Sequence, residues 1–158
     1  MEESVRVAGL ADRETLRSLA AEARAELSDK KGGDVVERLD PHRADSRAGI
    51  VDAVDDPDAT LLLGDIDGTP VGYGLMTLRT VVDGSSHATV EEIFVLPEAR
   101  SVGVGEAIIE ALLDDARERG AVAVQSTALP GDRATKNFFE SQGMAARSIL
   151  VHRWLDGR

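Results

Sequence analysis

The sequence predicts an α/β domain over residues 1–158, with a mixed, mostly antiparallel sheet flanked by about four helices. Three strand-like segments follow one another in the middle of the chain with turn signals between them, which predicts an antiparallel meander. A helix-like segment then leads to a further strand, and this order predicts a parallel crossover. A chain of 158 residues buries roughly 70% of its unfolded surface, enough for one core.

The first third of the chain predicts one strand and two helices. Residues 4–8 alternate in polarity, as in a half-buried strand. A helix is expected from an N-cap at Asp12, and its apolar positions recur every three or four residues: Leu16, Leu19, Ala20, Ala23 and Leu27. Residues 28–45 are polar and lack this periodicity, which predicts a loop. A second helix is expected over residues 44–54, ahead of Pro57.

The middle of the chain changes to strand periodicity. Residues 60–66 and 70–82 flank an Asp-Gly pair, which is a strong hairpin signal. A second turn at residues 83–86 leads to a strand over 88–96. Gly72 and Gly74 within the second strand predict a bulge or a close backbone approach.

The last third begins with a glycine-rich stretch over residues 97–105. The helix that follows has one apolar face and ends at Gly120, after which residues 121–127 form the crossover strand. A further helix is expected from about residue 130 to residue 141. Residues 145–155 alternate in polarity and predict a final strand.

Charge and composition exclude several classes of protein. The formal charge of -11 repels phosphate backbones, so we expect no nucleic-acid partner and favour a cationic small molecule. The absence of cysteine removes disulfides, thiolate metal sites and a cysteine nucleophile. The acidic N-terminus is unlike a secretory signal, and no segment approaches the ~18 apolar residues of a membrane span. These features predict a soluble, cytoplasmic protein with no membrane partner.

The glycine-rich stretch has the features of an anion site, because it joins a strand to the start of a helix. A P-loop would need Lys and Ser or Thr after Gly105, where Glu106 and Ala107 stand. A dinucleotide fold would need a third glycine at position 108, which is Ile. A tight strand-to-helix connection without a ligand is the alternative interpretation.

The motif Arg100-x-x-Gly103-x-Gly105, preceded by residues 93–97 (Ile-Phe-Val-Leu-Pro), resembles the acyl-CoA signature of the GNAT superfamily of N-acetyltransferases. The element order of nearly the whole chain is similar to that superfamily, and residues 138–144 resemble its Phe-Tyr-Glu-x-x-Gly-Phe ending. The resemblance implies a GNAT fold with six to seven strands and acetyl-CoA as cosubstrate.

The resemblance also implies where the cosubstrate binds. Backbone N–H groups of the turn would surround its pyrophosphate, and the strand before the turn would line the pantetheine arm where two strands splay apart. Asp132 occupies the place of a frequent asparagine that contacts this arm. The implied cosubstrate-binding residues are Ile93, Phe94, Val95, Arg100, Ser101, Val102, Gly103, Val104, Gly105, Glu106, Asp132 and Phe139.

Acyl transfer to an amine needs a proton acceptor, because a primary amine with a pKa near ~10 is mostly protonated at neutral pH. Glu92 and Glu91 lie where many amine-acetylating members of the superfamily carry acidic residues, and Glu92 is the preferred base. Adjacent strand residues face opposite sides, so at most one of the two is expected in a given cleft. Phe139 stands where the superfamily usually has a tyrosine acid, and Tyr73 is the only tyrosine.

Phe139 leaves three possibilities for the departing thiolate: water protonates it, Tyr73 reaches it, or the protein binds acyl-CoA without efficient turnover, as a sensor or partner module. The acceptor is expected to be a cationic small amine, with a protein N-terminus or lysine as the alternative. The dispersed His42, His87 and His152 predict no metal site. A homodimer is possible, but the sequence indicates no interface.

Overall fold

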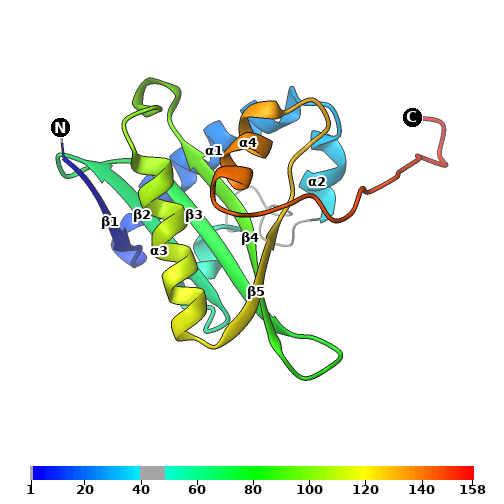
Figure 1. Ribbon diagram of the computed structural model, residues 1–158. Coiled ribbons are helices and arrows are strands. Elements are labelled where there is room, and N and C mark those ends of the chain that lie inside the picture. Colours follow the sequence, from blue (N-terminus) through cyan, green and yellow to red (C-terminus); the bar gives the residue numbers. More distant parts are fainter. Residues whose placement is uncertain (1, 40–48) are drawn as a thin grey trace.

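The computed structural model describes residues 2–39 and 49–158, and it forms a sheet with helices on both faces (Figure 1). The elements in chain order are β1 (Glu3–Val7), η1 (Leu10–Asp12), α1 (Arg13–Ser28), α2 (Gly33–Leu39), η2 (Val51–Asp55), β2 (Ala59–Ile66), β3 (Thr69–Thr80), β4 (Ser86–Val95), η3 (Pro97–Ala99), α3 (Val104–Glu118), β5 (Ala121–Ser126) and α4 (Arg133–Ser141).

The sheet has the order β1-β2-β3-β4-β5. Neighbouring strands from β1 to β4 are antiparallel, and β5 pairs with β4 in parallel through the crossover helix α3. The predicted hairpin, meander and parallel crossover are therefore confirmed.

α3 covers one face of the sheet, where it packs against β2 and β3 at unusually short range (Figure 1). A Cβ atom at Gly74 would lie 2.5 Å from Cγ2 of Ile108, and one at Gly64 would lie 2.6 Å from Cγ1 of Val104. A Cβ at Gly72 would lie 2.5 Å from the Phe94 carbonyl oxygen, so both glycines of β3 make the close approach that the sequence predicts. A larger residue at Gly64 or Gly74 would push α3 away from the sheet.

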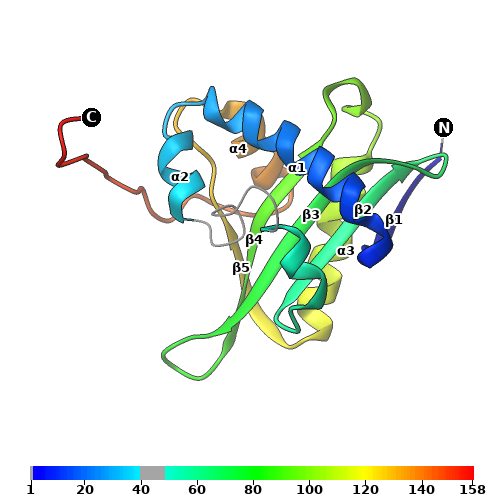
Figure 2. The same ribbon diagram turned by 180° about the vertical axis from the view of Figure 1, so that it is seen from behind.

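α1 and η2 cover the opposite face (Figure 2). Leu16 and Leu19 of α1 are buried there against β3 side chains that include Tyr73 and Leu75. The apolar face of α1 that the sequence predicts is thus the face that meets the sheet.

Two predictions for residues 28–54 are wrong within the described part of the chain. Residues 33–39 form α2 instead of a loop; Gly33 packs so closely on Leu27 that a Cβ would collide with its carbonyl, and Val35 is buried. A seven-residue helix held by such packing leaves little periodicity to detect. η2 is a short 3-10 helix where an α-helix over 44–54 was expected, and residues 44–48 of that expectation lie outside the described residues.

The predicted final strand is also wrong. Residues 145–155 form no strand, so the sheet of the described residues has five strands where six to seven were expected. A strand needs a neighbour, and this segment leaves α4, runs past α2 and ends away from the sheet (Figures 1 and 2).

Within residues 2–39 and 49–158, no helix is long and apolar enough to cross a membrane.

Candidate active site

The connection from β4 to α3 brings all the predicted turn residues, 100–106, into one short segment. Two of them have left-handed backbones: Ser101 with φ 70° and Gly103 with φ 93°, the residue that precedes the first turn of α3. The first N–H groups of a helix have no acceptor inside the helix, and the helix dipole places partial positive charge there. The Val104 side chain is buried, so only the main-chain groups of this residue could contact a ligand.

The second glycine of the turn has room for a side chain. A Cβ at Gly105 would lie 3.7 Å from Cε2 of Phe138, an ordinary contact. Two carboxylates lie near the turn: Glu106 in the first turn of α3, and Glu3, whose Oε1 would lie 3.7 Å from a Cβ at Gly103. Residues 101–106 carry no basic side chain, so an anion at this turn would meet main-chain groups.

The pairing between β4 and β5 ends before this turn. Their last paired residues are Val90 and Ser126, and the Ser126 hydroxyl donates to the Val90 carbonyl at 2.7 Å. β4 continues for five more residues to Val95, along an edge that no described strand pairs. Residues 93–95 therefore pair with β3 on one side and lie beyond the end of β5 on the other.

A bulge in β4 changes the expected orientation of the two carboxylates. Glu92 pairs with Leu75 and Val90 pairs with Met76, so Glu91 is an extra residue between them. Leu75 belongs to the α1 side of the sheet, and so does Glu92 as its cross-strand partner. Glu91 accepts a hydrogen bond at 2.7 Å from the hydroxyl of Thr77, two residues beyond Leu75 and on the same side. Both carboxylates thus reach the α1 side, contrary to the expectation that adjacent residues face apart.

Glu92 is held by the only tyrosine of the chain. The Tyr73 hydroxyl donates to Oε1 of Glu92 at 2.7 Å, and both side chains are buried, at 0% and 6% exposure. Tyr73 therefore does reach the candidate site from another element, but as a hydrogen-bond donor to the predicted base. Thr77, the partner of Glu91, was missed because only the strand register brings the two together.

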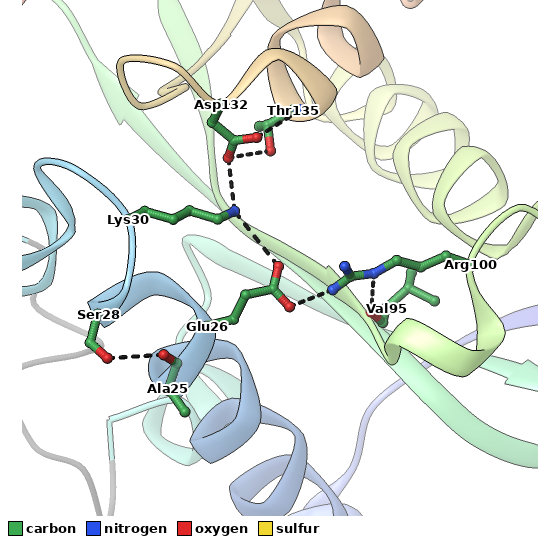
Figure 3. A network of polar contacts seen from close by, with 8 residues as sticks. All are labelled: Ala25, Glu26, Ser28, Lys30, Val95, Arg100, Asp132 and Thr135. Carbon is green, nitrogen blue, oxygen red and sulfur yellow. Dashed lines mark hydrogen bonds and ion pairs between the residues drawn. The ribbon is translucent and has the colours of Figure 1, made fainter.

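Arg100 points back toward β4 and α1, away from the turn that it precedes. Its Nε donates to the Val95 carbonyl at 2.9 Å, and its guanidinium forms an ion pair with Glu26 at 2.6 Å (Figure 3). Glu26 lies 3.6 Å from Nζ of Lys30, which binds Asp132 at 2.8 Å. These contacts link the end of α1, the end of β4 and the start of α4. No short-range pattern marks Glu26 or Lys30 as neighbours of the turn.

Asp132 caps α4. Its carboxylate accepts from the backbone N–H and the hydroxyl of Thr135 as well as from Lys30 (Figure 3). Burial would raise the pKa of Asp132, but the hydrogen bonds from Lys30 and Thr135 outweigh it and lower the pKa below its ordinary value. The carboxylate therefore stays charged and already has protein partners.

Phe139 is buried in the core on the α3 side, where its ring meets that of Phe138 edge-on at 5.5 Å between centroids. Of the histidines, His87 lies on β4 and His152 packs against Trp154 in the C-terminal segment, whereas His42 lies outside the described residues. Within residues 2–39 and 49–158, no cluster of His, Asp or Glu has the arrangement of a metal site.

The model of the acetyltransferase (GNAT) family matches residues 19–144, which contain the turn, the bulge and the parting strands. The chain belongs to the GNAT acetyltransferase family. A sequence comparison with curated proteins finds no match. As a GNAT acetyltransferase, the chain is an acyltransferase.

Three solved structures show the same fold at low sequence identity. A ribosomal-protein-alanine N-acetyltransferase from Brucella melitensis biovar Abortus 2308 has 21% identity and a TM-score of 0.72, over 97% of this chain and 99% of the other. AAC(6')-Iy, solved with the bisubstrate analogue CoA-S-monomethyl-acetylneamine, has 19% identity and a TM-score of 0.73, over 98% and 99%. The aminoglycoside acetyltransferase meta-AAC0020 from an uncultured soil metagenomic sample, solved with sisomicin, has 16% identity and a TM-score of 0.72, over 99% and 97%.

Proposed function

We propose that this GNAT protein is an acetyl-CoA-dependent N-acetyltransferase that acetylates a primary amine of a cationic small molecule. One observation carries the proposal. β4 loses its β5 partner after Val90, and within the next residues the chain supplies two carboxylates on one side and a main-chain anion turn at its end.

The turn suits the pyrophosphate of CoA. N–H groups of residues 101–106 offer donors at a helix start, which is the arrangement that binds phosphate without basic side chains. Residues 93–95 offer unpaired strand main chain to the amide groups of the pantetheine arm. Arg100 already donates to the Val95 carbonyl, so the arm shares that acceptor or shifts the guanidinium toward Glu26.

The two carboxylates take complementary roles. Glu92 accepts the proton that the acceptor ammonium must lose before its nitrogen can attack, directly or through a water molecule. Glu91, which is less buried, attracts the cationic acceptor. The amine nitrogen then forms a bond to the acetyl carbon, a backbone N–H near Val95 stabilises the oxyanion, and the carbon–sulfur bond breaks.

The departing thiolate takes its proton from water. Phe139 has no proton to give, and the Tyr73 hydroxyl is committed to Glu92. A thiolate is a tolerable leaving group in water, so the absence of a phenol at position 139 is compatible with turnover.

The acceptor class rests on charge. The net charge of -11 concentrates cations at the surface. The sisomicin complex of meta-AAC0020 supports a cationic small-molecule acceptor for proteins of this fold. A protein N-terminus, suggested by the name of the Brucella enzyme, is the competing acceptor.

The test is release of CoA thiol with a panel of amines and peptides, followed with a thiol-reactive dye. Because the chain has no cysteine, CoA is the only thiol that forms in the assay. We expect turnover with cationic amines, a loss of most activity near neutral pH in Glu92→Gln, and partial recovery at higher pH, where more acceptor is already neutral. Glu118→Gln, at the end of α3, is the matched control and should match the wild type.

Two results would overturn this proposal. Thiol release no faster than in buffer with every acceptor, together with tight acetyl-CoA binding, would identify a sensor. If neither Glu92→Gln nor Glu91→Gln changes the pH–rate profile, both carboxylates are excluded as the base.

A further inference from the structure

The face of the sheet that α1 covers changes from apolar to polar toward the β3–β4 hairpin. Tyr73 and Leu75 of β3 are buried under α1. Thr77 points to the same side two residues further along the strand, and it is half-buried. β3 and β4 extend past α1 to the turn that joins them (Figure 2). The polar part of this face therefore begins at Thr77.

Strand register places three polar side chains in one row across this face. Thr77 of β3 pairs with Thr89 of β4, and Thr89 pairs with Gln125 of β5. Cross-strand partners point to the same side of a sheet, so all three lie on the α1 side, and we call them the polar row. The other side of the same strands is apolar, because Met76 and Val90 are buried in the core under α3.

The polar row lies beside the proposed base and its neighbour. Glu91 accepts a hydrogen bond from the Thr77 hydroxyl at 2.7 Å, and Thr89 lies two residues before Glu91 on β4. The ladder between β4 and β5 ends one pair beyond Thr89 and Gln125. An amine that these carboxylates receive would therefore place the atoms next to its nitrogen over the polar row.

The hydrogen-bonding groups of the polar row suit a hydroxyl group. Because the Thr77 hydroxyl donates its proton to Glu91, its oxygen offers a ligand only lone pairs. The Thr89 hydroxyl and the Gln125 amide can donate, and within residues 2–39 and 49–158 neither side chain makes a hydrogen bond. An ammonium group cannot accept from these donors, whereas a hydroxyl group both donates and accepts.

The same face becomes basic beyond the polar row. The next cross-strand pair on this side is Arg79 with His87, and Arg79 is exposed. A second ammonium group of the acceptor would meet this positive charge, and like charges repel more strongly as they approach. The part of the acceptor that lies over the polar row is therefore uncharged.

We propose that the polar row selects an amino alcohol, a primary amine with hydroxyl groups on the carbons next to the one that carries the nitrogen. This inference rests on the proposed function, because it takes Glu91 and Glu92 as the carboxylates that receive the amine. Thr77 accepts a hydrogen bond from an acceptor hydroxyl, and Thr89 and Gln125 donate to one. Thr89 and Gln125 are then specificity-determining residues.

The test compares two small amines, serinol and isopropylamine, which share one carbon skeleton and differ by two hydroxyl groups. Release of CoA thiol gives kcat/KM for each amine, and the ratio of serinol to isopropylamine is measured for the wild type and for variants. The hydroxyl groups also lower the pKa of the amine, but this difference is the same for every protein. It cancels when the ratios of two proteins are compared.

Thr89→Val removes the hydroxyl with little change of shape and should lower the ratio about threefold or more. Adding Gln125→Leu should lower it about tenfold or more, because a second donor is lost. The kcat/KM for isopropylamine should stay at the wild-type value in both variants, and circular dichroism should show an intact fold. Thr80→Val is the matched control, because alternation places Thr80 on the α3 side of β3.

The possible failures are distinguishable. Turnover of both amines at a ratio that the double variant leaves unchanged would overturn this inference and leave the proposed function in place. An equal loss with both amines would show that the substitutions disturb the carboxylates or the fold, and it would overturn the inference too. Thiol release with no small amine at all would overturn the proposed function itself.

Discussion

At the scale of single residues, Tyr73 joins the core to the candidate base. Its ring is buried among the side chains under α1, and its hydroxyl reaches Glu92. A hydrogen bond to a charged group contributes about 1.5–3 kcal/mol, so it can fix the orientation of this carboxylate. Tyr73 is therefore a positioning residue.

Tyr73→Phe should retain the fold, because the ring still fills its site, and should lower kcat at least several-fold. The loss should fall on kcat more than on KM, because the hydroxyl orients the base and is not expected to bind the acceptor. Steady-state kinetics with the acceptor varied measures both constants. Thr80→Val, an exposed change at the end of β3, is the control. A lowered kcat accompanied by an equally lowered free energy of unfolding would indicate a purely structural contribution.

Two glycines of the same chain predict opposite responses to one methyl group. Gly74→Ala places Cβ 2.5 Å from Ile108 and 2.9 Å from Leu112, so α3 must shift, and overpacking of this kind costs about 1–3 kcal/mol. Gly105→Ala meets nothing closer than 3.7 Å within the first turn of α3, and should be neutral or stabilise by up to about 1 kcal/mol. Urea unfolding of the two variants measures the free energies. Equal effects would contradict the close approach of α3 to β3.

At the scale of elements, strong periodicity and turn chemistry could predict the strands and long helices, whereas contacts between distant segments decided the rest. The β4–α3 turn was predictable because glycine positions and the strand–helix order are local. The side on which Glu91 lies was not, because the bulge exists only in the pairing of β4 with β3. Residues 145–155 have the pattern of a strand, but a pattern cannot supply the neighbour that a strand requires.

α4 depends on its cap at Asp132, which ties it to Lys30 in the turn after α1. Asp132→Ala removes the cap and the ion pair and should lower the free energy of unfolding by about 1–2 kcal/mol. Asp132→Asn keeps a cap acceptor and should lose less. Urea unfolding at pH 7 measures the order of the three proteins.

The pH dependence of this cap follows from the lowered pKa of Asp132, which its hydrogen bonds from Lys30 and Thr135 maintain against burial. A carboxyl whose folded pKa lies below its unfolded value of about 3.9 stabilises the fold fully above that value. This stabilisation is lost as the pH falls through the folded pKa. The difference between wild type and Asp132→Asn should therefore shrink below about pH 4, and a constant difference from pH 7 to pH 3 would contradict the ion pair.

At the scale of the whole molecule, the two proposed substrates have opposite charges and meet one acidic protein. The net charge of -11 attracts a cationic amine and opposes the phosphates of acetyl-CoA, which the turn must bind through main-chain dipoles. The proposed site and the acidic surface therefore both attract the cationic acceptor. For acetyl-CoA the turn would attract the phosphates, whereas the acidic surface repels them.

This asymmetry predicts salt effects of opposite sign. The Debye length falls from about 10 Å at 0.1 M salt to about 3 Å at 1 M, so added salt screens both the attraction and the repulsion. As sodium chloride is raised, kcat/KM for a polycationic amine should fall, and more steeply than for a monoamine of similar basicity. The KM for acetyl-CoA should fall or stay level, because its repulsion is relieved. Initial rates with each substrate varied in turn provide both numbers. Equal salt dependence for the monoamine and the polycation would show that the acidic surface does not select the acceptor.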